Sequence, residues 1–116
     1  MVDEKTRINF GENSAQREEV TGKPRPDLIS PLAMLKLGEW ANDGASKYGE
    51  WNYIKGMPYS RYIQSIYRHL LKWHGGDKKE CHLSAIAWNA LALLHHEEMD
   101  EGKKWNDLPN FKKENK

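Results

Sequence analysis

The sequence predicts an all-α protein: a small bundle of three main helices with an ordered loop, completed by homo-oligomerisation. Three observations support this prediction. Apolar residues recur at helical spacing in three segments, and glycine- and proline-containing stretches separate those segments. The last segment, LSAIAWNALALL (83–94), is apolar nearly all the way round. The length of 116 residues corresponds to one domain.

Composition excludes several classes of protein. Lys plus Arg number 18 and Asp plus Glu 17, a net charge of +1, which argues against binding a nucleic-acid duplex through bulk charge. Five Trp and five Tyr are too many for a disordered chain. The single cysteine excludes a disulfide framework. No apolar run approaches the roughly 20 residues that span a bilayer, and the first residues do not resemble a signal peptide, so we expect a cytoplasmic protein without a membrane partner.

The chain divides into an arm, a helical domain and a tail. Residues 1–28 are expected to form an extended N-terminal arm, because TGKPRPD (21–27) contains two prolines that favour extended backbone. Residues 29–102 form the predicted helical domain, and 103–116 a polar C-terminal tail. The tail carries three apolar residues spaced as if to dock on a neighbour: Trp105, Leu108 and Phe111.

The first helix is predicted to begin at Pro31. Ser30 supplies a capping hydroxyl, and proline is favoured at the first helical position. Gly44 and Gly49 bracket the end of this helix. Residues 47–58 contain too many turn residues and aromatics to continue it, so we expect an ordered loop there.

Two further helices follow the loop. The second is predicted to start near 58–60 and to end at Gly75 and Gly76. The third is predicted to run from Asp77 to about Asp100. Its all-round apolar centre cannot be covered by two ordinary helices in so small a domain, so we expect a second subunit to cover it, in a homodimer or homotetramer.

The densest polar cluster lies in GGDKKECH and consists of Asp77, Glu80 and His82. Two carboxylates and an imidazole could hold Mg²⁺ or Mn²⁺. Alternatively, Asp77 is the N-cap and Glu80 the third residue of a capping box, which needs no metal. The sequence leaves both interpretations open.

A second acidic pair, Glu97 and Asp100, lies near the predicted end of the third helix. All-α nucleotide pyrophosphohydrolases bind Mg²⁺ between two acidic pairs on antiparallel helices. Here the pairs lie at opposite ends of one helix and could meet only across a subunit interface. The alternative is a solvated helix end, where we also expect His95 and His96.

Residues able to bind a nucleotide gather in the loop and on the second helix: Lys47, Tyr48, Trp51, Asn52, Arg68 and His69. An indole can stack on a base, and an asparagine amide can pair with the edge of adenine. Arg68 offers a bidentate fork to phosphate, and His69 a titratable donor. The alternatives are that Trp51 pins the loop to the bundle, and that Arg68 and His69 form a salt bridge and a half-buried histidine.

Three segments in order, GKPRPDLISP, GASKYGEWNYIKGMPYSR and IYRHLLKWHGGDKKECHLSAIAWNALALL, resemble the N-terminal domain of dATP/dGTP diphosphohydrolase. This phage-encoded family is associated with MazG-like enzymes, and the resemblance covers about residues 22–94. It highlights these positions: Lys23, Arg25, Asp27, Lys47, Tyr48, Asn52, Arg68, His69, Asp77, Glu80, His82 and Asn89. The acidic residue that follows the glycine in the family pattern has no counterpart here, because Asp77 directly follows Gly76.

The resemblance implies metal-dependent hydrolysis of a purine dNTP to dNMP and pyrophosphate, in the host cytoplasm if the protein is phage-encoded. The alternative is a non-catalytic sponge that sequesters a nucleotide or a cyclic nucleotide immune signal, an anti-defence role that needs only cations, amides and stacking faces. The expected catalytic residues are Asp77, Glu80 and His82, with Asp77 and Glu80 binding Mg²⁺ or Mn²⁺. The expected nucleotide-binding residues are Lys23, Arg25, Lys47, Tyr48, Trp51, Asn52, Arg68 and His69.

Overall fold

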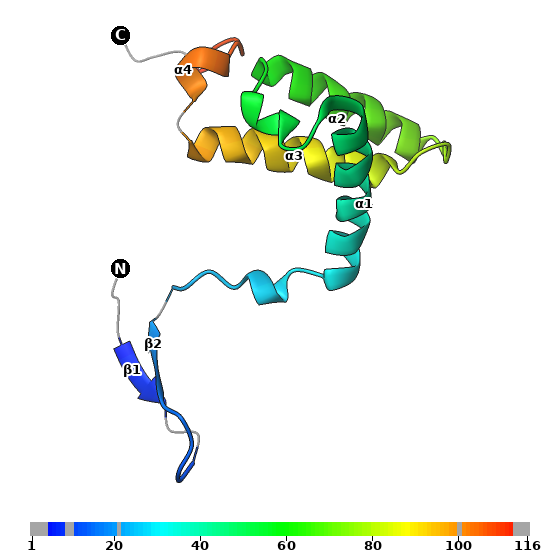
Figure 1. The fold of residues 1–116 in the computed structure, drawn as a ribbon. Helices are drawn as coiled ribbons and strands as arrows, with labels where there is room; N and C mark the ends of the chain where they lie inside the picture. The colour runs from blue at the N-terminus through cyan, green and yellow to red at the C-terminus, as the bar shows by residue number, and fades with distance from the viewer. Residues whose placement is uncertain (1–4, 9–10, 21, 100, 113–116) are drawn as a thin grey trace. The chain divides into compact units, whose positions relative to one another are not determined.

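The computed structural model describes residues 5–8, 11–20, 22–99 and 101–112, which belong to two compact units, 1–30 and 31–116. The first unit contains an antiparallel hairpin of β1 (Lys5–Ile8) and β2 (Arg17–Val20), in which Lys5 pairs with Val20. The short 3-10 helix η1 (Pro26–Leu28) follows (Figure 1). Residues 1–28 were predicted to form an extended arm without strand pairing, so the hairpin was not predicted. The prolines of 21–27 indicate extended backbone but do not show which segments pair.

The second unit is helical and contains the three main helices that the periodicity predicts. They are α1 (Pro31–Tyr48), α2 (Tyr59–His74) and α3 (His82–Glu98). The helices α2 and α3 pack against each other in antiparallel directions, and α1 also contacts α3 (Figure 1). The ordered loop holds the 3-10 helix η2 (Asn52–Lys55), and a short helix α4 (Gly102–Trp105) follows α3. None of the described helices is long and apolar enough to cross a membrane.

The predicted boundaries of the first two helices are confirmed. Helix α1 begins at Pro31, continues through Gly44 and ends before Gly49. Helix α2 ends at the two glycines, where the Gly75 N–H donates to the Leu71 carbonyl and Gly76 takes a left-handed φ of 93°.

Helix α3 begins five residues later than predicted. Its first residue is His82, and Cys81 is the preceding cap residue without a side-chain capping bond. The capping box between Asp77 and Glu80 is therefore wrong, because the Asp77 carboxylate bonds the His82 ring instead. Helix α3 ends at Glu98, and the predicted end at Asp100 lies outside the described residues.

The core of this unit joins α2 to α3. Tyr59 and Tyr62 of α2 and Ala92 of α3 are buried together. The C-terminal segment docks here on its own chain, because Trp105 packs against this core. The carboxylate of Asp107 accepts hydrogen bonds from the Ser60 backbone N–H at 2.9 Å and from the Ser60 hydroxyl at 2.5 Å.

The prediction of a solvated end for α3 is wrong at His96, which is completely buried. Its Nε2 donates to the Tyr53 carbonyl at 2.8 Å, and its Nδ1 bonds the Glu101 carboxylate. The imidazole thus connects α3 to the loop before it and to the segment after it.

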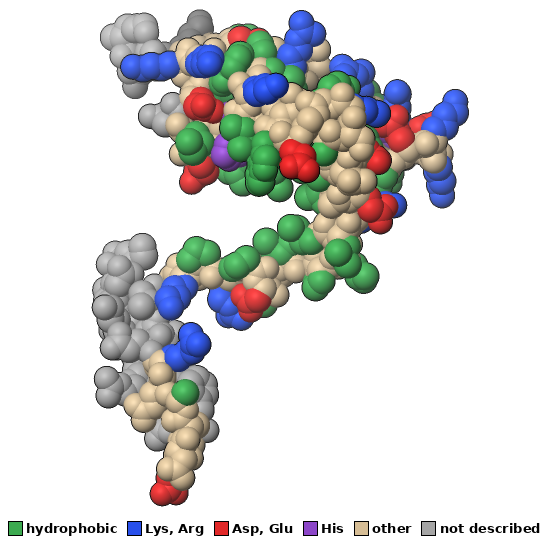
Figure 2. Space-filling view, in the orientation of Figure 1, with side chains coloured by type: hydrophobic (Ala, Val, Ile, Leu, Met, Phe, Trp, Pro, Cys, Tyr) green, Lys and Arg blue, Asp and Glu red, His purple; other side chains and the backbone are tan. Residues whose placement is uncertain are grey.

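Several large apolar side chains of the helices remain open to solvent in the single chain (Figure 2). Leu32 and Leu35 of α1 are 82% and 72% exposed, and Leu83 and Leu94 of α3 are 51% and 57% exposed. The segment 83–94 is apolar on all sides, and the single chain leaves part of it, at Leu83 and Leu94, open to solvent.

Candidate functional site

A pocket of about 440 Å³ opens between α1, the loop that contains η2, and α3. Four aromatic side chains form its walls: Tyr48, Trp51, Tyr53 and Trp88. A neighbouring hollow of about 420 Å³ shares three of these walls and extends toward Trp40 and Asn89. Both hollows lie within the second unit.

The floor of the pocket consists of small residues of α1. Ala41, Gly44 and Ala45 are spaced three and four residues apart, so they share one face of the helix. A β-carbon added at Gly44 would have no neighbouring atom within 4 Å. The floor is therefore open and free of bulky side chains, a shape that suits a planar ring.

Tyr53 is at the centre of the aromatic walls. Its ring centroid lies 5.1 Å from that of Trp88 and 5.9 Å from that of Trp51. Trp51 is 66% exposed and has a left-handed backbone, with φ of 63°. A bulky residue rarely adopts this φ. Because the Trp51 side chain is largely exposed, its burial does not compensate for the strained backbone. This arrangement favours the interpretation that Trp51 presents its indole to a ligand over the interpretation that it anchors the loop.

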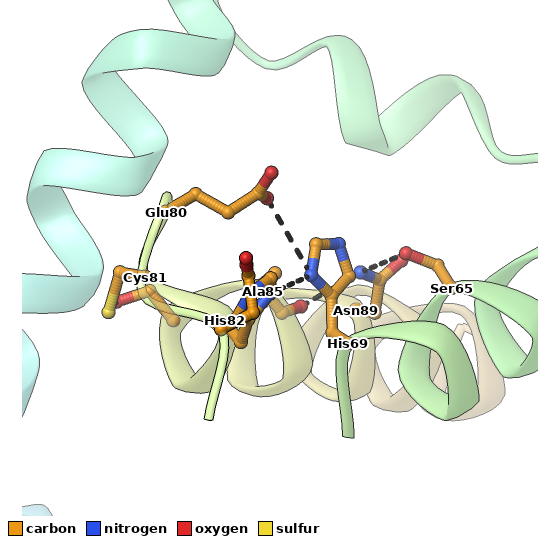
Figure 3. A network of polar contacts seen from close by, with 9 residues as sticks. Ser65, His69, Glu80, Cys81, His82, Ala85 and Asn89 are labelled. Carbon is orange, nitrogen blue, oxygen red and sulfur yellow. Dashed lines mark hydrogen bonds and ion pairs between the residues drawn. The ribbon is translucent and has the colours of Figure 1, made fainter. Parts of the chain in front are cut away.

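A polar cluster forms where α2, the α2–α3 loop and the first turn of α3 meet (Figure 3). The Nδ1 atoms of His69 and His82 are 2.8 Å apart, and a Glu80 carboxylate oxygen is 3.6 Å from His69 Nδ1. On the other side of the His82 ring, Nε2 lies 2.5 Å from an Asp77 oxygen. The side chain of His82 is 1% exposed, that of His69 16% and that of Glu80 46%.

The hydrogen bonds indicate where the protons of the cluster lie. The Asp77 carboxylate accepts the His82 Nε2–H. The two facing Nδ1 atoms share one proton, so one ring donates it and the other accepts it. Burial lowers the pKa of His69, and the bond with His82 lowers the pKa of Asp77. The cluster thus combines a half-buried His69 of lowered pKa with an ionised Asp77.

The polar cluster lies beside the second hollow. The ring of Trp40, which lines the second hollow, meets the His69 ring edge-on with centroids 6.1 Å apart. Asn89 lines the same hollow, and its amide donates to the Ser65 hydroxyl at 3.2 Å beside His69 (Figure 3). The cluster residues line neither hollow, so Trp40 and Asn89 are the residues that connect the second hollow to the cluster.

Two cations of α2 act on the cluster. Burial has the largest effect on the pKa of His69 and lowers it, and the Glu80 carboxylate opposes this shift. The positive charges of Lys72 and Arg68 have smaller effects, which lower the pKa further. Both side chains belong to exposed residues. Lys72 was missed in the sequence, although it lies one helical turn after Arg68 on the same face.

The structure brings most predicted site residues into two groups. His69, Asp77, Glu80 and His82 meet in the cluster. Tyr48, Trp51 and Asn52 line the pocket. The pocket walls missed by sequence reasoning are Trp40, Tyr53 and Trp88; the recurrence of Trp40, Gly44 and Tyr48 at four-residue spacing was the available signal.

Four predicted nucleotide-binding residues are not part of either group: Lys23, Arg25, Lys47 and Arg68. Lys47 is exposed at the end of α1 and does not line the pocket. Lys23 and Arg25 belong to the first unit, where the Arg25 guanidinium pairs with Asp27 at 2.8 Å.

The second acidic pair does not join the cluster within the described chain. Glu97 is exposed near the opposite end of α3, and Asp100 lies outside the described residues. Among residues that the structure describes, one trio of potential metal ligands is close enough to share an ion: His69, Glu80 and His82.

The second unit is thus an α-helical unit with an aromatic pocket and a carboxylate–histidine cluster. Residues 13–107 match the family described as dATP/dGTP diphosphohydrolase, N-terminal. The chain belongs to this family, as its motifs predict. No significant match was found among curated proteins or among solved structures.

Proposed function

We propose that this protein binds a purine deoxynucleoside triphosphate and hydrolyses it to the monophosphate and pyrophosphate. The observation that carries the proposal is the proximity of the second hollow to the polar cluster, because Trp40 lines that hollow and its ring contacts the His69 ring. The name of the family supports the substrate class.

The base would occupy the aromatic pocket. A volume of about 440 Å³ falls in the range of roughly 300–1,000 Å³ typical of small-molecule sites. The indole of Trp51 and the ring of Tyr48 offer stacking faces above the flat floor of α1, and the Asn52 amide can pair with a purine edge.

The phosphates would extend toward the polar cluster, where Arg68 and Lys72 supply positive charge. A divalent ion, Mg²⁺ or Mn²⁺, would neutralise phosphate charge and polarise the phosphorus. The trio of His69, Glu80 and His82 could hold one divalent ion, because its ligand atoms all lie within 4.8 Å of one another, and its two imidazoles suit Mn²⁺ better than Mg²⁺. In this proposal Asp77 orients His82 through its hydrogen bond.

Hydrolysis adds water to the α-phosphorus, breaks its bond to the oxygen that bridges to the β-phosphate, and releases pyrophosphate. The water must lose a proton. The Glu80 carboxylate reaches solvent and would accept this proton with the oxygen that does not hold the ion. The lone pairs of His69 and His82 would be used to hold the ion, so these rings would not act as the base.

A nucleotide-binding sponge is the second candidate. It is favoured by the small number of carboxylates at the cluster, because MazG-like enzymes use four and the described residues here supply Asp77 and Glu80. A sponge needs the pocket and cations but no assembled metal site.

The deciding assay is release of pyrophosphate from dATP and dGTP with Mg²⁺ or Mn²⁺. Glu80→Gln keeps the shape of the side chain and should lower turnover by about 10²-fold or more, while nucleotide affinity is retained. A wild-type protein that binds nucleotide tightly and releases no pyrophosphate would establish the sponge instead.

The pocket itself can be tested by filling it. Gly44→Leu should abolish nucleotide binding without lowering stability, because a β-carbon there has no neighbouring atom within 4 Å and the rest of the side chain can occupy the open pocket. Gly38→Leu is the matched control: Gly38 is also in α1, also has open space around it, and does not line the pocket. Equal nucleotide affinity in both variants would place the base elsewhere.

The same proposal includes a homo-oligomer, a homodimer or homotetramer, that covers the exposed apolar residues of α1 and α3. We place it in the cytoplasm, where deoxynucleotide pools lie.

A further inference from the structure

We propose that His69, Glu80 and His82 form a preassembled site for one divalent transition-metal ion, with Asp77 as the residue that positions His82. This inference rests on the proposed function, which it deepens by naming the ligands and the class of ion. Its test needs no nucleotide and no turnover.

The two histidines already face each other as metal ligands would. Their Nδ1 atoms are 2.8 Å apart and share one proton. Transfer of that proton to the outer Nε2 of His69 leaves two Nδ1 lone pairs directed into the same space, which an ion can then occupy. Both rings are then neutral, and the neutral imidazole is the form that binds a metal.

Glu80 completes the trio from a different element. Its carboxylate lies 3.6 Å from His69 Nδ1, too far for a strong hydrogen bond, and its side chain is 46% exposed. The hydrogen-bond chain from Asp77 through His82 to His69 does not need it. A long, partly exposed carboxylate beside two inward-facing nitrogens can move the short distance needed to coordinate an ion.

Asp77 supplies the supporting contact that is typical of histidine ligands. Its oxygen accepts the His82 Nε2–H at 2.5 Å, so the opposite nitrogen, Nδ1, is the one presented to the trio. Carboxylate–histidine–metal arrangements of this kind set the tautomer and orientation of the ligand. The His82 ring is also 1% exposed, which holds this orientation by packing.

The donor atoms select the class of ion. Two imidazole nitrogens and one carboxylate suit zinc, iron, cobalt or manganese, whereas Mg²⁺ prefers oxygen ligands and retains most of its waters. Three protein ligands leave at least one coordination position open. The site should therefore bind Zn²⁺, Co²⁺ and Mn²⁺ more tightly than Mg²⁺.

The test is equilibrium dialysis of the chelator-stripped full-length protein against Zn²⁺, Co²⁺, Mn²⁺ and Mg²⁺ without nucleotide. We expect one transition-metal ion per chain, bound at least about 10-fold more tightly than Mg²⁺. The Co²⁺ absorption band should report imidazole coordination. His69→Gln and Glu80→Gln should each weaken binding by at least about 10-fold, and Asp77→Asn by about 10- to 100-fold.

His74→Gln is the matched control, because His74 is an exposed histidine at the end of α2 outside the trio. Circular dichroism confirms that each variant is folded. Absence of a stoichiometric ion, or equal binding by His69→Gln and His74→Gln, would overturn the metal site.

The two proposals fail separately. Stoichiometric metal binding without pyrophosphate release would support the metal site and overturn the hydrolase. Hydrolysis that needs only Mg²⁺, in a protein that binds no transition metal, would support the hydrolase and overturn the metal site.

Discussion

The indole of Trp105 lies where a β-carbon of Gly56 would have to be, with Cε2 only 2.7 Å from that position. Gly56 also has a left-handed backbone, with φ of 81°. The close approach fixes the C-terminal segment against the end of η2, the 3-10 helix of the pocket loop. Glycine is required at this position for two independent reasons, contact and backbone conformation.

Gly56→Ala should destabilise the protein by about 1–3 kcal/mol, the usual cost of inserting a group into a packed contact. Urea denaturation measures the change. Gly44→Ala is the control: with open space and a helical backbone, it should be neutral or stabilising by up to about 1 kcal/mol. In a Trp105→Ala background the cost at Gly56 should fall, and an unchanged cost would show that the indole contact contributes nothing.

Asp107→Asn should lower the melting temperature at neutral pH, because the carboxylate holds the first turn of α2 through both Ser60 groups. The bond from the Ser60 hydroxyl lowers the pKa of Asp107 below 3.8. The pKa of Asp107 is lower in the folded protein than in the unfolded chain, where it is 3.8. The stabilisation by Asp107 is therefore present above pH 3.8 and is lost as the pH falls through the pKa of the folded protein.

The difference in melting temperature between wild type and Asp107→Asn should therefore narrow as the pH is lowered below 3.8. Scanning calorimetry at several pH values measures it, with Asp43→Asn, which changes an exposed residue of α1, as the control. A difference that stays constant through the acidic range would contradict a role for the charged carboxylate.

The helices were predictable because their signals are local. Apolar spacing, the Ser30–Pro31 start and the Gly75–Gly76 stop all act within a few residues. The start of α3 was not predictable in the same way. The pattern Asp77 to Glu80 matches a capping box locally, but a side-chain bond to His82 competes for the Asp77 carboxylate and wins.

The site was predictable only in part, for the same reason. The sequence alone suggested three of the site residues, His69, Glu80 and His82, because imidazole and carboxylate groups can bind a metal or transfer a proton at any position. The pocket walls Trp40 and Trp88 come from different helices, and periodicity alone assigns such residues to a core. The burial of His96 likewise depends on the distant Tyr53 carbonyl, which no local pattern reveals.

Trp51→Gly should separate binding from folding. Glycine accepts the left-handed φ of 63° without the cost of roughly 1–2 kcal/mol that a side chain incurs there. Loss of the ring contact with Tyr53 should cost about 0.5–1.5 kcal/mol, so stability should change little. Nucleotide affinity should fall by about 1–3 kcal/mol, the usual value of one base-stacking aromatic.

Equilibrium binding of dATP to Trp51→Gly, made in the Glu80→Gln background to prevent turnover, measures this loss. Trp51→Ala should lose the same affinity but be less stable than Trp51→Gly, because alanine keeps the φ cost. If both variants bind as well as the parent, Trp51 does not contact the base.

The last prediction concerns assembly through the apolar faces of α1 and α3. Leu32, Leu35, Leu83 and Leu94 are each more than half exposed, although apolar surface gains roughly 25 cal/mol per Å² when it is buried. The buried hydrophobic residues among those described are Tyr59, Tyr62, Ala85 and Ala92, a small core for a helical unit. Burial between subunits would supply the missing stabilisation.

Sedimentation velocity at micromolar concentration should therefore show a homodimer or homotetramer and no folded monomer. Leu32→Glu with Leu35→Glu should dissociate the assembly and lower the melting temperature together, because the charges cannot be desolvated in an apolar interface. Phe111→Ser is the control, since it removes an apolar side chain that is 87% exposed in the tail rather than on α1 or α3. A compact wild-type monomer that melts independently of protein concentration would show that the isolated chain is stable with these leucines in water.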